Sequence, residues 1–506
     1  VVLCKDTPAF IGNRIGVYSM LAVTHLIEKL GLTVEEVDKY TGPAMGHPKS
    51  ATFRTADVVG LDTLVNVAKG LEQNAPNDEA KGVFVLPEFI SKMVENKWLG
   101  EKTKKGFYEK VKDDKGNSEI LSLNLKDLTY GPQQKVKSST LEATKPVEDI
   151  RMRMKVYEQG TDKAAELFRA MHYPLFEYVS NRVPEITDDF FRIDDAMRAG
   201  FGWEIGPFEV WDALGVKETL EKIKKEEKRL PGQSGEVAQW VKDMLEAGFD
   251  SFYKIENGVR HYYDIASKSY KPIPGTEELI VLDHIREAKT IWKNSGVSII
   301  DLGDGIINCE FHTKMNTIGG DVIQGLNKAI DLAEKEYRGL VISNDGKNFS
   351  AGANIGMIFM MAVEQDYDEL NMAVKMFQDT SMRLRYSAIP VVAAPFQLAL
   401  GGGCEFSMHA DFVQLHAETY MGLVEFGVGV IPGGGGSKEF ALRASDDYRP
   451  DQIDQNFMKD RFLTIGQAKV STSAVEAYEL GYLQEGKYAI TMNRARLLAD
   501  AKAKAL

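Results

Sequence analysis

Residues 399–436 read ALGGGCEFSMHADFVQLHAETYMGLVEFGVGVIPGGGG, and this stretch decides how the C-terminal part of the chain is interpreted. It holds two glutamates, Glu405 and Glu425, between two glycine runs. Three consecutive glycines at 401–403 are unfavourable inside a helix or strand, so they predict a turn where a ligand approaches the backbone. A helix is expected to start at Cys404, and the amides of the turn would then be free donors at its positive end, which suits an oxyanion.

A second glycine turn precedes this stretch. Residues 348–354 read NFSAGAN and follow an apolar run at 339–343 that predicts a buried strand. Two such turns could aim two amides at one carbonyl oxygen, and the nearby carboxylates could move protons while an enolate is stabilised. Taken singly, a glycine-rich loop is most often only a loop, and a glutamate is most often a solvated surface residue.

The combination resembles the crotonase (enoyl-CoA hydratase) family over about residues 296–483. The matching elements are SAGAN, GGGCE and a glutamate twenty positions further on, before GVGVIPGGGG. The resemblance implies that the amides of Ala353 and Gly402 form an oxyanion hole for a thioester carbonyl. It also implies that Glu405 is the base that activates water and Glu425 the acid that protonates the α-carbon.

Two departures from that family are visible. Asn354 stands where the family often has aspartate, a minor change because the backbone amide carries the chemistry. Residues 445–460 form a polar insertion beside the expected acyl pocket. The methionines at 357, 360 and 361 could pack adaptably around an acyl chain, but an ordinary core is the favoured interpretation.

The N-terminal part carries a different resemblance. KDTPAFIGNR at 5–14 and TKKGFY at 103–108 are similar to the C-terminal helical domain of 3-hydroxyacyl-CoA dehydrogenases, over about residues 1–110. The resemblance implies that Asn13 positions the dehydrogenase substrate, although an asparagine at a helix start more often caps the backbone. The sequence contains no GxGxxG, so this chain alone is expected to lack NAD binding. The apolar run Val1–Cys4 predicts a buried strand whose first residues are absent, so further sequence is expected before Val1.

An internal repeat follows. Asn181-Arg182 resembles Asn13-Arg14, and residues 193–215 resemble residues 37–60. GFDSFY at 248–253 resembles GFY at 106–108, which ends the first unit. Two copies of one helical unit are expected to pack face to face, as two subunits of a symmetric dimer would. The second copy is interpreted as structural, and it could also form a wall between active sites.

The predicted fold is a multidomain α and α/β protein, in which a duplicated all-helical dehydrogenase C-terminal domain precedes a crotonase-like β/α (spiral) domain. Periodicity and turn signals predict a helix at 11–30 ended by a glycine, a connecting helix at 277–293, a hairpin at 297–311 and a helix at 319–335. The predicted domains are 1–112 (first copy), 113–148 (linker or surface excursion), 149–292 (second copy) and 293–506 (crotonase-like).

Composition excludes some classes of function. The formal net charge of -13 over 506 residues argues against nucleic acid or an anionic membrane surface as the main partner. Three cysteines without a CxxC pair or metal spacing favour a reducing compartment, here the cytoplasm, and no metal is expected. No apolar run is long enough to span a bilayer.

The predicted function is hydration of trans-2-enoyl-CoA to 3-hydroxyacyl-CoA in fatty-acid β-oxidation. Hydration needs no cofactor, and CoA is part of the substrate. The order of domains resembles dehydrogenase-first fusions, so the complete protein is expected also to oxidise 3-hydroxyacyl-CoA to 3-ketoacyl-CoA with NAD. The alternatives are a crotonase-fold enoyl-CoA isomerase and a non-catalytic CoA-binding subunit that docks in a β-oxidation complex. Expected partners are acyl-CoA thioesters, with a thiolase and a homo-oligomer as candidates.

Overall fold

The computed structural model describes residues 1–112, 116–226, 229–448, 451 and 454–506. These residues form two compact units. The helical unit comprises Val1–Lys254 and His261–Lys271, and the sheet unit comprises Ile255–Arg260 and Pro272–Leu506. In the described residues, no helix combines the length and the apolar character that crossing a bilayer requires.

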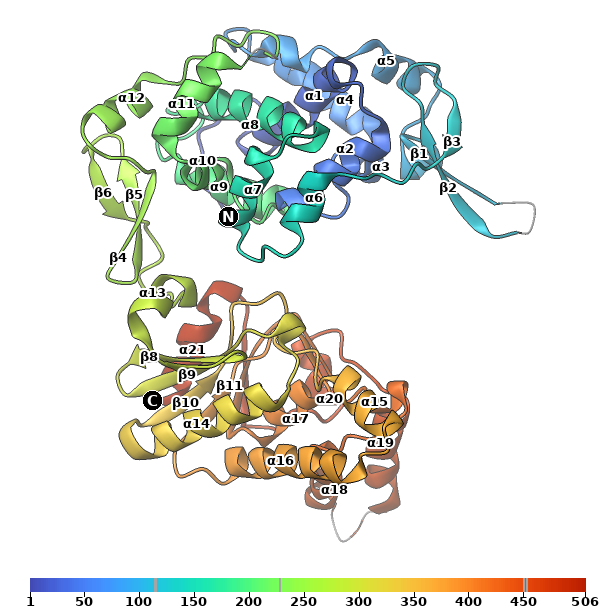
Figure 1. Ribbon diagram of the computed structural model, residues 1–506, viewed down its shortest axis with the longest axis vertical. Coiled ribbons are helices and arrows are strands. Elements are labelled where there is room, and N and C mark those ends of the chain that lie inside the picture. Colours follow the sequence, from blue (N-terminus) through green and yellow to red (C-terminus); the bar gives the residue numbers. More distant parts are fainter. Residues whose placement is uncertain (113–115, 227–228, 449–450, 452–453) are drawn as a thin grey trace. The chain divides into compact units, whose positions relative to one another are not determined.

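The helical unit is built from two successive sets of elements (Figure 1). The first set is α1 (Gly12–Leu30), α2 (Val34–Tyr40), α3 (Phe53–Val59), α4 (Leu61–Asn74), α5 (Glu88–Glu95), β1 (Tyr108–Lys112), β2 (Ser118–Leu123) and β3 (Tyr130–Pro132). The second set follows α6 (Ser139–Thr144) and α7 (Ile150–Gln159), and it is α8 (Lys163–Asn181), α9 (Phe191–Phe201), α10 (Pro207–Leu214), α11 (Val216–Lys225), α12 (Gln239–Glu246), β4 (Tyr253–Glu256), β5 (Val259–Asp264) and β6 (Ser269–Pro272). The sets match in order, so the helical unit is a structural repeat.

One side-chain network recurs in both copies. Asp38 in α2 accepts hydrogen bonds from an N–H at the start of α3 (2.6 Å) and from the Tyr108 hydroxyl (2.8 Å). Asp194 in α9 likewise accepts from an N–H near the start of α10 (2.9 Å) and from the Tyr253 hydroxyl (2.6 Å). Each carboxylate therefore satisfies the free amides of the next helix, and each is fixed by the tyrosine of the closing GFY or SFY segment.

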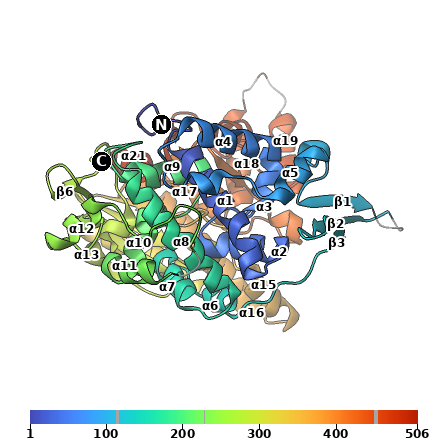
Figure 2. The same cartoon turned by 90° about the horizontal axis from the view of Figure 1, so that it is seen from above.

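The two copies pack through their equivalent long helices. α1 lies against α8 (Figure 1 and Figure 2), and the rings of Tyr18 and Tyr178 stack with centroids 3.9 Å apart. The predicted face-to-face packing is confirmed. The proposed echo of Asn13-Arg14 in Asn181-Arg182 is wrong, because Asn13 lies in the first turn of α1 whereas Asn181 is the last residue of α8.

Three predictions for the helical unit can be compared with the structure, and they do not all hold. The predicted first helix is confirmed, and it ends where Gly31 adopts a left-handed φ of 57°. Val1–Cys4 is not a buried strand: it has no regular structure, and three of its four residues are exposed. Of the predicted linker at 113–148, residues 113–115 lie outside the described part. The rest is more ordered than predicted, because β2 pairs with β1 and β3, and α6 is capped by the Ser138 side chain.

The sheet unit is organised around a seven-stranded sheet of order β15-β13-β11-β10-β9-β8-β7. β9 to β15 are parallel along this order, whereas β7 and β8 are antiparallel additions at one edge. The strands are β7 (Thr290–Lys293), β8 (Val297–Gly303), β9 (Ile306–Phe311), β10 (Gly339–Ile342), β11 (Val391–Ala393), β13 (Phe412–His416) and β15 (Tyr488–Thr491). The hairpin predicted at 297–311 is β8–β9, and the buried strand predicted at 339–343 is β10.

Helices cover the sheet and complete its core. They are α13 (Leu282–Lys289), α14 (Gly320–Glu336), α15 (Ile355–Val363), α16 (Tyr367–Arg385), α17 (Gly402–His409), α18 (Gly436–Asp447), α19 (Asp454–Gly466), α20 (Ala474–Glu479) and α21 (Leu497–Ala505). α14, the helix predicted at 319–335, packs against β8, β9 and β10, and α21 packs against β10, β11 and β13 (Figure 1). The predicted connecting helix at 277–293 is shorter than expected, because it ends with α13 and its last residues form β7.

Candidate active site

Two short parallel strands outside the main sheet bring the predicted catalytic glutamates together. β12 (Gln397–Leu400) pairs in parallel with β14 (Thr419–Gly422). Because parallel strands end at the same edge, the segments that follow them meet there. α17, which carries Glu405, follows β12, and the short helix η5 (Glu425–Val428) follows β14. A hydrogen bond from the Gly401 N–H to the Gly422 carbonyl (2.8 Å) joins the C-terminal ends of β12 and β14.

Glu405 is almost fully buried, with 3% of its surface exposed. Its Oε1 accepts a hydrogen bond from the Gly436 N–H at 2.8 Å. A Cβ built on Gly434 would lie only 2.4 Å from Oε2, so the glycine run must lack side chains to close over this carboxyl group. Burial raises the pKa of Glu405 to about 8, and the neighbouring Glu425 charge adds to this rise, whereas the amides of the glycine run oppose it.

Glu425 is the first residue of η5 and lies beside the first glycine turn. A Cβ on Gly401 would be 3.4 Å from its Oε1. Its Oε2 is buried, and it has no hydrogen-bond partner in the described part of the chain. Burial raises the pKa of Glu425 to about 7. A buried, unpartnered carboxyl oxygen is costly, so a water molecule or a ligand group is the expected partner of this oxygen.

This burial predicts a pH-dependent stability change in Glu425→Gln. The pKa of Glu425 rises from 4.5 to about 7 on folding, so folding favours its protonated form. The stability that this provides is complete below the unfolded-state pKa and is lost as the pH rises through about 7. A neutral glutamine avoids the loss, so the variant should be more stable than the wild type above pH 7, by at most about 3 kcal/mol. Thermal unfolding at acidic and alkaline pH measures the difference, which should vanish at the acidic end.

The turn before Ala353 packs closely on the start of α17. Gly352 has a φ of 94°, and a Cβ there would meet the Leu400 carbonyl oxygen at 2.9 Å and the Gly402 nitrogen at 3.3 Å. Only glycine combines this backbone conformation with so close an approach. Among the described residues, neither the Ala353 amide nor the Gly402 amide has a hydrogen-bond acceptor. The structure thus brings two free donors to the edge where the two glutamates lie.

Behind the second glycine run lies a histidine that the sequence analysis left without a role. His409 Nδ1 is 2.7 Å from the Glu405 carbonyl oxygen, and its Nε2 is 3.0 Å from Lys438 Nζ. Burial lowers the pKa of His409 to about 4, so the ring is neutral at pH 7. Its Cε1 would be 2.7 Å from a Cβ on Gly435. No local motif marks His409, because its contact with Lys438 arises only when α17 and α18 pack together.

The predicted dehydrogenase residue lies in the other unit. Asn13 lines a cavity of about 340 Å³ together with His47, whose ring stacks on Trp203 at 4.3 Å. Phe201 and Trp203, which follow from the second copy, lie on the same cavity. The second copy therefore supplies part of the lining of the cavity that contains Asn13.

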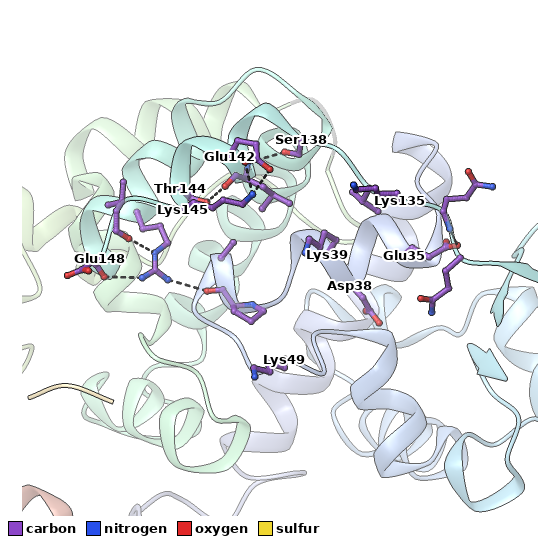
Figure 3. A pocket seen from close by; sticks show the side chains of 18 of the residues that line it. Glu35, Asp38, Lys39, Lys49, Lys135, Ser138, Glu142, Thr144, Lys145 and Glu148 are labelled. Carbon is purple, nitrogen blue, oxygen red and sulfur yellow. Dashed lines mark hydrogen bonds and ion pairs between the residues drawn. The ribbon is translucent and has the colours of Figure 1, made fainter. Parts of the chain in front are cut away.

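A larger cavity in the helical unit, of about 920 Å³, contains none of the predicted site residues (Figure 3). Its lining mixes charges of both signs. Lys145 pairs with Glu142, Asp38 is used by the helix-capping network described above, and Arg153 donates to backbone carbonyls. The described residues also contain no group of three or more His, Cys, Asp or Glu that could hold a metal ion.

The favoured interpretation of the methionines as core is wrong. Met357 and Met360 lie on α15, and their side chains are 49% and 60% exposed. None of the residues of α15 is buried, although the helix is almost entirely apolar. Periodicity cannot distinguish the two cases, because an apolar helix buried in a core and one that presents a binding surface have the same composition.

Comparison with known proteins bears on both units. Residues 10–110 and 169–254 match the family "3-hydroxyacyl-CoA dehydrogenase, C-terminal domain". Residues 301–444 match the family "Enoyl-CoA hydratase/isomerase". The chain carries domains of both families. The first family is matched twice, in agreement with the repeat seen in the helical unit, and the hydratase/isomerase match covers both glycine turns and both glutamates.

Similar proteins match this chain over different shares of their own length. A Bacillus subtilis protein named "Probable 3-hydroxyacyl-CoA dehydrogenase" is 44% identical over 503 residues, which are 99% of this chain and 61% of that protein. A Rickettsia felis protein, provisionally named a fatty acid oxidation complex trifunctional enzyme, is 27% identical over 88% of this chain and 56% of its own. A solved enoyl-CoA hydratase from Thermoplasma volcanium aligns over 42% of this chain and 78% of its own, at 22% identity and a TM-score of 0.35. The chain therefore spans 61% and 56% of the lengths of the two curated relatives from Bacillus subtilis and Rickettsia felis.

Proposed function

We propose that the sheet unit catalyses the reversible hydration of trans-2-enoyl-CoA to 3-hydroxyacyl-CoA. The observation that carries this proposal is the pair of neighbouring glutamates with raised pKa values, beside two backbone amides that have no acceptor among the described residues. Glu405 is buried, and Glu425 is half-buried with one buried, unpartnered oxygen. A raised pKa near neutrality suits a carboxyl group that takes up and gives back protons at physiological pH.

In the proposed reaction, the thioester carbonyl accepts hydrogen bonds from the amides of Ala353 and Gly402. Glu405 removes a proton from water as the water oxygen bonds to the β-carbon of the enoyl group. Negative charge then develops on the thioester oxygen and is stabilised by the two amides. Glu425 delivers its proton to the α-carbon, which completes the addition of water across the double bond. Exchange of a proton with solvent returns the pair to its starting state.

The direct test is hydration of crotonyl-CoA by this chain without NAD, followed as loss of the absorbance of the conjugated thioester. Turnover is the expected result. An enoyl-CoA isomerase would instead move the double bond of a 3-enoyl substrate without consuming water. A docking subunit would bind acyl-CoA and turn over neither substrate, and this outcome would overturn the proposal.

The pair of glutamates predicts a bell-shaped pH profile for hydration. The reaction needs one protonated and one ionised carboxyl group, and the raised pKa values of the two glutamates, about 7 and about 8, place the singly protonated pair between them. The proposed mechanism uses the form of this pair in which the proton lies on Glu425 and Glu405 is ionised, and this form exchanges its proton with the form that is protonated on Glu405. As the pH falls below about 7, the pair gains a second proton and loses its base; as it rises above about 8, the pair loses its acid. A kcat/KM profile for crotonyl-CoA measures this, and a profile that stays flat over this range would contradict it.

The oxidation of 3-hydroxyacyl-CoA is proposed for the longer protein of which this chain would form part. Asn13 would position the substrate there, in the cavity that it lines. NAD is proposed as the cofactor of the longer protein, and no step of that reaction is assigned to residues of this chain, which has no GxGxxG. Acyl-CoA thioesters are the proposed substrates, and a thiolase and a second copy of the chain are candidate partners. The cytoplasmic location stays a prediction from the cysteine content.

A further inference from the structure

A buried histidine lies one helical turn from the proposed base. Glu405 and His409 are four positions apart on α17, so their side chains share one face of that helix. Both are almost fully buried, with 3% and 1% of their surfaces exposed. His409 has no step in the proposed reaction, and yet the structure holds it beside the group that the reaction needs most.

The second glycine run packs over both side chains at once. A Cβ on Gly434 would lie 2.4 Å from Glu405 Oε2, and a Cβ on Gly435 would lie 2.7 Å from His409 Cε1. The next amide along the run, the Gly436 N–H, donates to Glu405 Oε1 at 2.8 Å. The position of this amide against the carboxyl group therefore depends on how the run packs on the imidazole ring.

Both ring nitrogens of His409 are used, and their contacts fix the tautomer. Nδ1 lies 2.7 Å from the Glu405 carbonyl oxygen, which can only accept, so Nδ1 carries the proton. In the neutral ring Nε2 then has a lone pair, and it accepts from Lys438 Nζ at 3.0 Å. The imidazole thus joins the backbone of the residue that carries the proposed base to the first turn of α18.

The first turn of α18 is itself held in place by Glu439, which is fully buried. Its Oε1 accepts from Lys438 Nζ at 2.5 Å and from Arg385 Nη1, at the end of α16, at 2.6 Å. The Glu439 N–H donates to the Gly435 carbonyl at 2.9 Å. The lysine that meets His409 is therefore anchored to the same glycine run and to a neighbouring helix.

His409 stays neutral over the pH range of the proposed reaction, because burial lowers its pKa to about 4. The charged or titratable groups around His409 and Glu405 come from four elements, and they are Cys404 on α17, Lys438, Glu439 and Arg443 on α18, Arg385 on α16 and Glu425 on η5. A change in the pH profile of a His409 variant would therefore not arise from titration of the imidazole.

We propose that His409 is a positioning residue for the base of the hydration: by joining the Glu405 backbone to Lys438, it holds the Gly436 N–H against the Glu405 carboxyl group. The inference rests on the proposed hydration, in which Glu405 takes a proton from water. A donor to a carboxylate stabilises its ionised form, so the link sets how readily Glu405 ionises. Its two ends can be removed separately, because His409 lies on α17 and Lys438 on α18.

His409→Ala removes the link without changing the charge of the site, because the ring that it replaces is neutral. With the glycine run released from the ring, the Gly436 N–H should stabilise the Glu405 carboxylate less. The acidic limb of the kcat/KM profile for crotonyl-CoA should therefore move to higher pH by about one unit, the effect that one backbone N–H has on a carboxylate pKa. On that limb kcat/KM should fall by about tenfold, and the loss should shrink towards the top of the profile.

The dependence of this loss on pH separates positioning from a structural role. If His409 only maintained the fold, His409→Ala would lower kcat/KM by the same factor at every pH, and that result would overturn the proposal. If the wild type hydrates crotonyl-CoA and the variant keeps the wild-type acidic limb, the His409 inference fails while the proposed hydration stands. If the wild type does not hydrate crotonyl-CoA, the proposed hydration fails and the inference falls with it.

Lys438→Met removes the other end of the link. The Lys438 side chain is 43% exposed, so this variant should fold even if His409→Ala does not. It should move the acidic limb in the same direction, and the shift should persist at about 1 M salt, which screens a through-space effect of the lost charge. Lys335→Met on α14 is the matched control, because Lys335 is 78% exposed and also pairs with the glutamate that follows it. Its profile should equal that of the wild type.

The double variant His409→Ala/Lys438→Met shows whether the two residues act as one link. If they do, its acidic limb should move no further than that of either single variant, because the first substitution already breaks the link. Shifts that add in the double variant would mean that the two residues act independently, and this result would overturn the proposal.

Discussion

Glu425→Gln should reduce kcat for crotonyl-CoA hydration by about 10²–10⁴-fold, the range that a single proton-transfer group contributes. The amide keeps the size of the carboxyl group but has no proton to deliver to the α-carbon. Glu405→Gln should reduce kcat by a similar factor, because its amide can still accept the Gly436 N–H yet cannot take a proton from water. Losses of this size can be measured in single-turnover experiments, with the enzyme in excess over crotonyl-CoA.

The control for both variants is Glu418→Gln, which changes an exposed glutamate in the same stretch of sequence. It should leave kcat at the wild-type value. Binding of a non-hydratable acyl-CoA should also persist in both active-site variants, since the thioester contacts would be made by backbone amides. If only one of the two variants lost activity, a one-glutamate isomerase mechanism would explain the result better than hydration.

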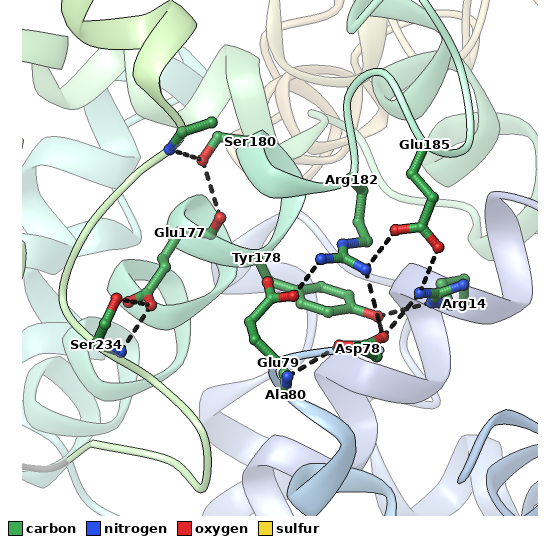
Figure 4. A network of polar contacts seen from close by, with 11 residues as sticks. Arg14, Asp78, Glu79, Ala80, Glu177, Tyr178, Ser180, Arg182, Glu185 and Ser234 are labelled. Carbon is green, nitrogen blue, oxygen red and sulfur yellow. Dashed lines mark hydrogen bonds and ion pairs between the residues drawn. The ribbon is translucent and has the colours of Figure 1, made fainter. Parts of the chain in front are cut away.

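Asp78→Asn should destabilise the helical unit by about 3–5 kcal/mol, the cost of breaking a fully buried ion pair by removing one partner. Asp78 Oδ2 lies 2.8 Å from Arg14 Nη2, with neither side chain exposed, and it accepts the Tyr178 hydroxyl at 2.9 Å. Arg182 approaches the same oxygen at 3.6 Å (Figure 4). The substitution leaves two buried guanidinium groups around a neutral amide, and because Glu185 still pairs with both of them, the loss should lie at the lower end of this range.

Thermal unfolding followed by circular dichroism or calorimetry would measure this effect as a lower Tm for the helical unit. Asp188→Asn is the matched control, because the Asp188–Lys5 pair is exposed and such pairs contribute little. The double variant Asp78→Leu/Arg14→Met should recover part of the loss, since an apolar pair of similar volume replaces the charges. An Asp78→Asn protein as stable as the wild type would show that the network does not hold the two copies together.

Regular elements with strong periodicity were predictable from the sequence. α1 and α14 have apolar residues at helical spacing, and β8 and β9 flank a glycine-containing turn, so local patterns alone predict them. The order of glycine turns and glutamates also predicted which groups meet in the sheet unit. This worked because each glutamate follows its strand so closely that the parallel pairing of β12 and β14 leaves little freedom in where it lies.

Features that depend on distant contacts were not predictable. Val1–Cys4 has the composition of a strand, but no neighbouring strand pairs with it among the described residues, and an apolar segment without a partner does not become a strand. His409 meets Lys438 only because α18 packs against α17, and none of the apolar residues of α15 is buried in the described part of the chain, although α15 contacts α16. Sequence periodicity predicts whether a segment forms a helix or a strand, but it does not predict which helices and strands pack against each other.

The pairing of α1 with α8 has a thermodynamic consequence. In a dimer of separate subunits, association weakens on dilution, because each encounter must overcome the loss of translational freedom. Here the two equivalent helices belong to one chain, so their local concentration is set by the connecting segment and stays constant at any protein concentration. The two halves of the helical unit are therefore permanently matched one to one, and the Tm of this unit should be independent of how far the protein is diluted.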